Sequence, residues 1–181
     1  IQLSLGAIYA WSVFAKPLQD SGWSTSATQW PFTVGLVTFA VVMVLAGRVL
    51  HVVGPRKLTV AGGVLLGIGY LLAGATSEVS FWPVLIGVGL LGGAGIGLGY
   101  VVPIAVGMQW FPDKKGLITG IAVAGFGLGA MIWVKLAGTW GELISSYGLG
   151  NTFMIYGGIF MVLVLLGSVW MTFPPHFKVP D

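Results

Sequence analysis

Long apolar segments, separated by short polar connections, dominate this chain. After the first fifteen residues, five runs of mostly apolar residues follow one another, and each ends in charge, proline or a polar cluster. A helix needs about 20 such residues to cross the hydrocarbon core of a bilayer. Only 7% of the residues are charged, whereas a soluble domain carries about 25% to keep its surface wet. The sequence therefore predicts an all-α polytopic membrane protein.

Six transmembrane helices are expected, with boundaries good to a few residues. Residues 1–15 are apolar but too few for a full span of about 20 residues before Lys16-Pro17, and they predict a first helix whose start is missing. The other five helices are expected at Thr28–Val49, Lys57–Ala75, Phe81–Trp110, Lys115–Trp140 and Asn151–Phe173.

The cations lie mainly on alternate connections between these helices. Six of them fall on one side of the predicted bundle: Arg48, Arg56, Lys57, Lys114, Lys115 and Lys178. The other side has only Lys16 and Lys135, beside Asp20, Glu78 and Glu142. Because cytoplasmic connections are enriched in Lys and Arg, both ends of the segment are predicted to be cytoplasmic, in the cell (plasma or inner) membrane.

Several classes of function lack their residues in this sequence. There is no cysteine, and His51 and His176 are far apart with no carboxylate at ligand spacing, so no metal or other cofactor is expected. A continuous basic face, which a nucleic-acid partner would need, is missing too. No Asp or Glu lies near the centre of a span, which argues against a membrane enzyme. A self-assembling six-helix scaffold stays open as another class.

The glycine-rich run GVGLLGGAGIGLG at residues 87–99 begins with the letters of a dinucleotide-binding loop, G-x-G-x-x-G. Such a loop needs a strand before it and a carboxylate about 20 residues later. Asp113 lies 21 residues beyond Gly92, but the run itself sits inside an apolar span. In lipid, small residues let helices approach closely. The run therefore predicts a packing face, with one stripe at Gly89, Gly93 and Gly97 and a similar seam on the fifth helix at Gly116, Gly120, Gly125 and Gly129.

The connection between the second and third helices resembles the loop signature of the major facilitator superfamily, G-x-x-x-D-R-x-G-R-R. Gly47, Gly54 and Arg56 fall in register with it, and His51 stands where the pattern has Asp. In that family the loop makes charge contacts that latch one conformation, and here its acidic member is missing. A cytoplasmic loop with a glycine turn is the alternative interpretation.

The region from helix four to helix five resembles the oxalate/formate antiporter family of that superfamily, which includes monocarboxylate carriers. The run from Trp110 to Gly120, WFPDKKGLITG, carries the likeness, and residues 6–17, GAIYAWSVFAKP, match the first-helix motif of that family. Pro112 is expected to end the fourth helix and Asp113 to cap the fifth, with the lysines facing anionic lipid.

This resemblance covers the whole chain but only the N-terminal six of the family's twelve helices. It implies secondary active transport of small carboxylates, of the oxalate/formate or lactate/pyruvate type, by alternating access. A carrier of another small metabolite is the alternative, and exchange and proton symport both stay open. The implied partners are a small organic anion, the bilayer and a C-terminal six-helix half, which would hold the cations that neutralise the substrate. The family also implies two inverted three-helix repeats, with Gly6-x-x-Tyr9 and Gly97-x-x-Tyr100 as corresponding residues.

The resemblance further suggests which side chains contact the substrate. Tyr9, Tyr100 and Phe126 match positions that line the cavity in the family, with packing between helices as the alternative. Ile8 stands where oxalate carriers can have a polar residue, which favours a ligand with an apolar portion such as lactate or pyruvate. Lys135 lies 19 residues beyond Gly116, about 28 Å along a helix, which places it near the outer interface. It is expected to extend to the headgroups near Glu142 or to attract anions at the entrance.

Pro103 is expected to kink the fourth helix, since proline removes one backbone hydrogen bond.

Overall fold

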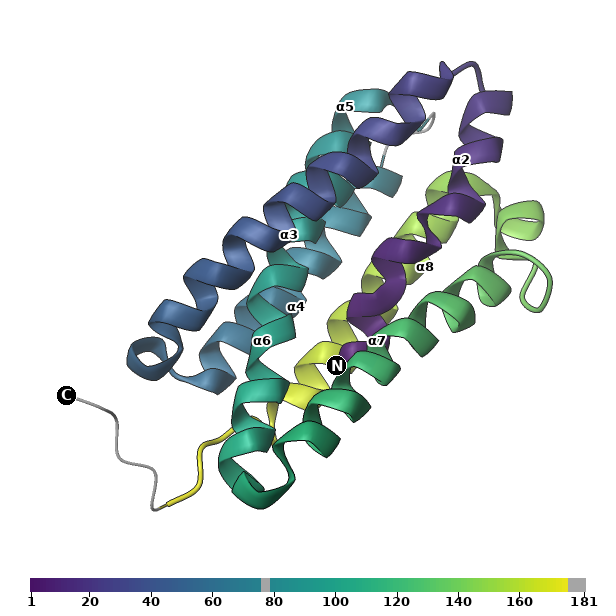
Figure 1. The fold of residues 1–181 in the computed structure, drawn as a ribbon. Helices are drawn as coiled ribbons and strands as arrows, with labels where there is room; N and C mark the ends of the chain where they lie inside the picture. The colour runs from purple at the N-terminus through teal and green to yellow at the C-terminus, as the bar shows by residue number, and fades with distance from the viewer. Residues whose placement is uncertain (76–78, 176–181) are drawn as a thin grey trace.

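The computed structural model describes residues 1–75 and 79–175, and the described residues form helices without any β-strand, as expected for an all-α fold (Figure 1). His176, Lys178 and Glu78 lie outside the described residues. Five helical stretches are long and apolar enough to cross a membrane: Thr25–Val53, Pro55–Gly74, Phe81–Trp110, Pro112–Ala137 and Leu143–Ser168. The elements that contain them are α3 (Thr25–Val53), α4 (Pro55–Gly74), α5 (Phe81–Val84), η2 (Leu85–Gly92), α6 (Gly93–Trp110), η3 (Pro112–Lys114), α7 (Lys115–Ala137) and α8 (Leu143–Ser168).

The first helix is divided into three pieces that follow one another directly. These are α1 (Gln2–Leu5), the 3₁₀ segment η1 (Gly6–Ala10) and α2 (Trp11–Asp20). A change from α to 3₁₀ winding alters which carbonyl groups are paired inside the helix. Near this change, the carbonyl of Leu3 accepts a hydrogen bond of 2.7 Å from the indole N–H of Trp133 in α7. This hydrogen bond ties α1 to α7 just before the tighter segment.

The connection between α3 and α4 differs from the prediction. The sequence predicted a helix end at Val49 and a loop up to Lys57, but α3 runs on to Val53 and α4 begins at Pro55. The charged residue Arg48 did not end the helix, because a long cationic side chain can leave its stem on apolar surface and its head in water. The connection is therefore the single residue Gly54, whose φ of 92° suits glycine.

The fourth apolar segment, Phe81–Trp110, forms one continuous helical run with the predicted bounds. It consists of α5, the π-helical segment η2 and α6. Pro103 lies inside α6, and a kink at this residue stays a prediction. The change of winding that the structure does show lies earlier, in η2, where the glycine-rich run begins.

The fifth and sixth helices bring two corrections. Asp113 was expected to cap the fifth helix, but α7 has no side-chain cap hydrogen bond, and Asp113 lies in the 3₁₀ turn η3 that precedes it. The sixth helix was expected to start at Asn151, whereas α8 starts at Leu143 and is interrupted at Gly148, with φ 79° and ψ 170°. Residues 145–150, SSYGLG, looked like a loop because they contain two Ser and two Gly, yet residues 143–147 form a short helical turn before Gly148.

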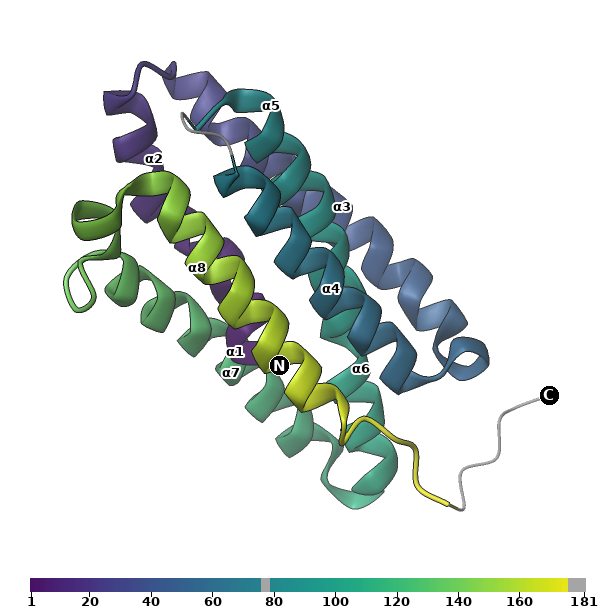
Figure 2. The ribbon, with the colours of Figure 1, turned by 180° about the vertical axis from the view of Figure 1, so that it is seen from behind.

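The helices pack in pairs that are distant in the sequence. In Figures 1 and 2, α3 lies along α6, α4 lies along α8, and α7 lies along the first helix. The side facing the viewer in Figure 1 is formed by α2, α3, α6 and α7, while α4 and α8 form the opposite side in Figure 2. The α2–α3–α6–α7 side is called the open face below, because α3 and α7 are the least buried of the long helices.

Close packing confirms the interpretation of the glycine-rich run. A Cβ atom added at Gly93 would lie 2.6 Å from the carbonyl oxygen of Gly35 in α3, and one added at Gly95 would lie 2.6 Å from that of Gly62 in α4. These glycines therefore let α6 touch two helices at backbone distance, and no phosphate-binding loop is formed.

The seam predicted on the fifth helix is only half correct. Gly125 and Gly129 meet the first helix, but no atom lies within 4 Å of a Cβ added at Gly116 or Gly120. These last two glycines lie on the exposed part of α7.

Candidate functional site

Three residues predicted from three different helices come together on the open face. The ring of Phe126 in α7 lies 5.6 Å from that of Tyr9 in η1 and 5.0 Å from that of Tyr100 in α6, with interplanar angles of 86° and 76°. Edge-to-face contacts of this kind are favourable for aromatic pairs. Phe126 is buried, whereas 47% of the Tyr9 side chain is exposed. The arrangement leaves an accessible tyrosine over a packed aromatic base.

A fourth ring belongs to the same group and was missed by the sequence analysis. Phe39 of α3 lies 5.4 Å from the ring of Tyr100 and 6.2 Å from that of Phe126. It sits in a mostly apolar part of α3, where no motif of its own distinguishes it from its neighbours. The four rings of Tyr9, Phe39, Tyr100 and Phe126 are called the aromatic cluster below.

The aromatic cluster has an internal correspondence that a repeat would produce. Gly6 of the first helix faces the carbonyl group of Phe126, and Gly97 of the fourth faces the carbonyl group of Phe39, at 2.9 Å from an added Cβ. In both helices, the tyrosine three residues after the glycine makes an edge-to-face contact with that same phenylalanine. The internal repeat could have identified Phe39, because Phe39 contacts the fourth helix in the same way as the predicted residue Phe126 contacts the first.

The crossing of the third and sixth helices shows the same reciprocity. A Cβ atom added at Gly67 in α4 would lie 3.0 Å from the carbonyl oxygen of Gly157, and one added at Gly157 in α8 would lie 2.8 Å from that of Gly67. Each of these contacts that helices one, two and three make with the other three helices thus has a counterpart made from the second set of helices to the first. This is the geometry expected of two three-helix units related by a two-fold axis.

Gln2 is a second residue that sequence reasoning did not find. Its side-chain N–H group donates a hydrogen bond of 3.0 Å to the carbonyl oxygen of Tyr100, which joins the first helix to α6 beside the aromatic cluster. Only 9% of Gln2 is exposed, and its Oε1 atom has no hydrogen-bond partner among the described residues. An unpaired buried polar atom is costly. We interpret Gln2 as a positioning residue for Tyr100, because its hydrogen bond holds the backbone of α6 at that residue.

The structure places the other two predicted substrate contacts elsewhere. Ile8 is 4% exposed, and its Cδ1 atom lies 3.4 Å from a Cβ added at Gly35, in the core between the first helix and α3. Lys135 lies in the last turn of α7, nine residues or about 13 Å beyond Phe126. Its Nζ atom is 5.9 Å from the ring centroid of Trp140, an exposed residue. Neither side chain joins the aromatic cluster.

The residues of the predicted conformational loop lie at two helix junctions. Gly47 is inside α3, Gly54 forms the joint with α4, and Arg56 is exposed in the first turn of α4. At the second junction, Asp113, Lys114 and Lys115 are all exposed. His51 packs against Phe173, with ring centroids 5.5 Å apart. A role of these residues in a conformational change stays a prediction.

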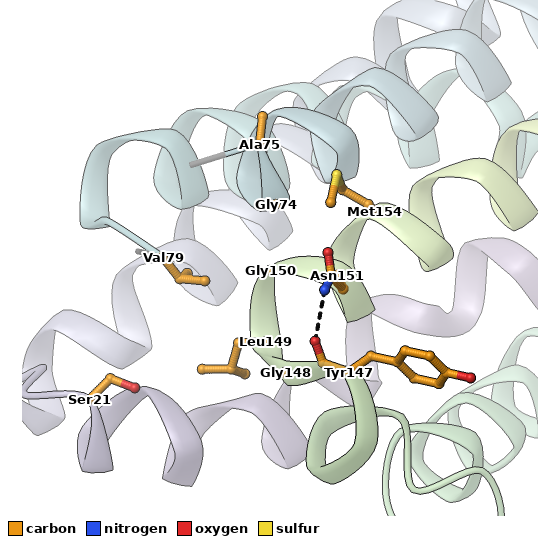
Figure 3. Close-up of a pocket in the computed structure, with 10 residues that line it drawn as sticks. All are labelled: Ser21, Gly74, Ala75, Val79, Tyr147, Gly148, Leu149, Gly150, Asn151 and Met154. Carbon is orange, nitrogen blue, oxygen red and sulfur yellow. Dashed lines mark hydrogen bonds between the residues drawn. The ribbon is translucent and has the colours of Figure 1, made fainter. Parts of the chain in front are cut away.

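A pocket of about 760 Å³ lies away from the aromatic cluster (Figure 3). It is found between the end of α4 and the start of α8, where Gly148 interrupts the helix. Asn151 lines it and donates a hydrogen bond of 2.9 Å to the carbonyl oxygen of Tyr147. No side chain of the aromatic cluster borders this pocket. It borders the helix break at Gly148 and is separate from the candidate site.

Comparison with known proteins gives consistent results. The Major Facilitator Superfamily profile matches residues 2–181. The chain is 32% identical over 181 residues to an uncharacterized MFS-type transporter, YhjX, of Escherichia coli (strain K12), covering 98% of this chain and 43% of the relative. It is 32% identical over 170 residues to the oxalate:formate antiporter of Oxalobacter formigenes, covering 93% and 39%. It is 33% identical over 121 residues to apicoplast pyruvate carrier 1 of Toxoplasma gondii, covering 66% and 20%.

The chain thus spans less than half the length of these relatives.

Proposed function

The chain belongs to the major facilitator superfamily, and from this premise we propose that it forms the N-terminal six-helix half of a carrier for small carboxylates. The substrate would be of the oxalate/formate or the lactate/pyruvate type. It would cross the membrane by alternating access, with the open face turned toward a C-terminal half. The observation that carries the proposal is the aromatic cluster, which gathers side chains from four helices on that face.

The chemistry of the aromatic cluster suits a small organic anion with an apolar portion. The hydroxyl groups of Tyr9 and Tyr100 are hydrogen-bond donors for carboxylate oxygens, and the rings offer apolar surface. Ile8 influences the site indirectly, because its side chain is buried in the core between the first helix and α3. The aromatic cluster carries no cation, so the charge of the substrate is neutralised by groups of the C-terminal half.

The charged residues at the ends of the bundle have supporting roles in this proposal. Lys135 lies near the outer interface and attracts anions to the entrance. The junctions at Gly54–Arg56 and Asp113–Lys115 lie on the cytoplasmic side, where they influence the change between conformations. Both ends of the segment are cytoplasmic, and the carrier resides in the cell membrane.

Names of relatives support the substrate class. One relative is named as an oxalate:formate antiporter, another as a pyruvate carrier, and a third, from Homo sapiens, as monocarboxylate transporter 14. Transport rather than catalysis is what these relatives have in common.

The test is transport by the full-length protein in proteoliposomes. We expect saturable uptake of at least one of oxalate, formate, lactate and pyruvate, and competition by the others. The same vesicles without protein are the control. If no small carboxylate shows saturable uptake while the reconstituted protein is folded, the proposal is wrong.

A further inference from the structure

A small pocket opens between α2 and α3, directly beside the aromatic cluster. Its volume is about 260 Å³, below the range of about 300–1,000 Å³ that is typical of drug-sized ligands. Tyr9 is shared between this pocket and the aromatic cluster. The residues that line it are Tyr9, Trp11, Ser12, Ala15, Gln29 and Phe32.

Side chains with neutral hydrogen-bond donors line this pocket. The side chains of Ser12 and Gln29 are exposed, and neither makes a hydrogen bond within the described residues. The indole N–H of Trp11 is already used, since it donates a hydrogen bond of 2.7 Å to the carbonyl oxygen of Thr28. One hydroxyl donor from Ser12, two N–H donors from Gln29 and one phenol donor from Tyr9 remain.

The donor count matches one carboxylate group. A carboxylate has two oxygen atoms with about four lone-pair positions, and it accepts hydrogen bonds without donating any. No Asp or Glu lines the pocket, so nothing there repels an anion. The remaining walls are apolar: Phe32 lies 6.4 Å from the ring of Tyr9, and Ala15 completes the lining. A ligand of few atoms with one carboxylate fits both the size and the polarity.

We propose that Ser12, Gln29 and Tyr9 form a subsite for the carboxylate group of the substrate, called the Ser12–Gln29 subsite below. This inference rests on the proposed function and adds to it a second binding position. Ser12 lies three residues beyond Tyr9, about 5 Å further along the helix axis, since the first of these steps are in the 3₁₀ segment. A carboxylate held there is thus one turn from the aromatic cluster, and Tyr9 can donate to it in either position.

The neutral donors of Ser12, Gln29 and Tyr9 are suited to a binding position that the substrate occupies only briefly during transport. Hydrogen bonds between neutral donors and a carboxylate orient the ligand, but they leave its charge uncompensated. The ligand therefore moves on to the aromatic cluster, where the opposite half supplies the cation.

Full-length variants in proteoliposomes test the subsite, with the carboxylate that the wild type transports as the probe. Gln29→Glu keeps the shape of the side chain but replaces its donors by a negative charge. We expect it to raise KM at least about tenfold, while Gln29→Met and Ser12→Ala raise KM about threefold, with small changes in Vmax. Ser26→Ala, an exposed serine on α3 that does not border this pocket, is the matched control and keeps the wild-type KM.

The outcomes separate the two proposals. If the wild type transports a carboxylate and Gln29→Glu keeps its KM, the Ser12–Gln29 subsite is wrong while the proposed function stands. If the wild type transports only uncharged compounds, the proposed function fails first. Thermal stability in detergent is measured for every variant; should Gln29→Glu not fold, wild-type KM values for Gln29→Met and Ser12→Ala would overturn the subsite.

Discussion

Helices α4 and α7 are both rich in glycine, yet they use it differently. Of the apolar stretch of each helix, 56% is buried in α4 but only 22% in α7. A Cβ atom added at Gly62, Gly63 or Gly67 of α4 would come within 3.0 Å of a neighbouring helix, while Gly116, Gly120 and Gly127 of α7 have no such neighbour. Glycine content alone therefore does not identify an internal contact. On α7, Gly125 and Gly129 meet the first helix, whereas Gly116, Gly120 and Gly127 mark a surface that faces outward from this half.

This difference predicts where a change harms folding and where it harms transport. Residues on the α4–α8 side hold the half together, whereas residues on the open face are available to a substrate and to a second half. The first experiment below challenges this contrast directly, and the others refine it.

The largest effect is expected from Gly95→Val, at the contact between α6 and α4. An added Cβ would lie 2.6 Å from both the carbonyl oxygen of Gly62 and the backbone nitrogen of Leu66, so backbone must move. We expect a loss of about 3 kcal/mol or more in the free energy of unfolding, seen as a lower Tm in detergent. Gly120→Val on α7 is the control, with a change of less than about 0.5 kcal/mol. Equal losses at the two positions would remove the contrast between the helices.

Tyr100→Ala should affect transport more than stability. Tyr100 is partly exposed on the open face and makes edge-to-face contacts with the rings of Phe39 and Phe126. Loss of the hydroxyl donor and of ring contacts should raise the apparent KM for the carboxylate about tenfold. Tyr100→Phe keeps the ring but loses the hydroxyl group, so its KM should lie between those of the wild type and of Tyr100→Ala. An unchanged KM in Tyr100→Ala would assign this residue to packing alone.

Gln2→Met is expected to have a smaller effect, because it removes one hydrogen bond. The first helix would lose its link to the carbonyl of Tyr100, which is worth about 1 kcal/mol, and KM should rise about threefold to fivefold. A structural role alone would lower Tm without changing KM. Gln109→Met, at an exposed glutamine further along α6, serves as the control. A drop in Tm with wild-type KM would contradict the positioning role.

Lys135→Met should have the smallest effect, and one that depends on salt. A cation near the entrance raises the local concentration of anions, and ions screen this attraction. Uptake at low ionic strength should fall about twofold, and the difference from wild type should vanish at about 0.5 M salt. A loss that persists at high salt would instead indicate direct contact with the substrate.

Much of the fold followed from the sequence, because apolar length and charge are local properties. The run Phe81–Trp110 has the predicted bounds, and Pro112 follows the end of the helix as expected. Errors arose where a local signal had two meanings. Arg48 looked like a helix end but is an exposed residue inside α3. The first residues of the predicted loop SSYGLG form part of a helical turn before Gly148.

The site was less predictable, since it depends on contacts between distant segments. Tyr9, Tyr100 and Phe126 were found through their motifs, and the structure brings them together. Phe39 and Gln2 have no motif. Their importance comes from the crossing of α3 and α6 and from one hydrogen bond over 98 residues of sequence. The stripe of glycines on α7 misled for the same reason, because periodicity does not say which neighbour a face meets.

The single-residue joint at Gly54 has a mechanical consequence. One extended residue spans about 3.5 Å, so the adjoining ends of α3 and α4 cannot slide apart by more than a few ångströms. Any tilt of α3 is transmitted to α4, and through the glycine crossing at Gly67 and Gly157 it reaches α8. Lengthening this joint by a few flexible residues would give α3 slack relative to α4 and let the two helices tilt independently.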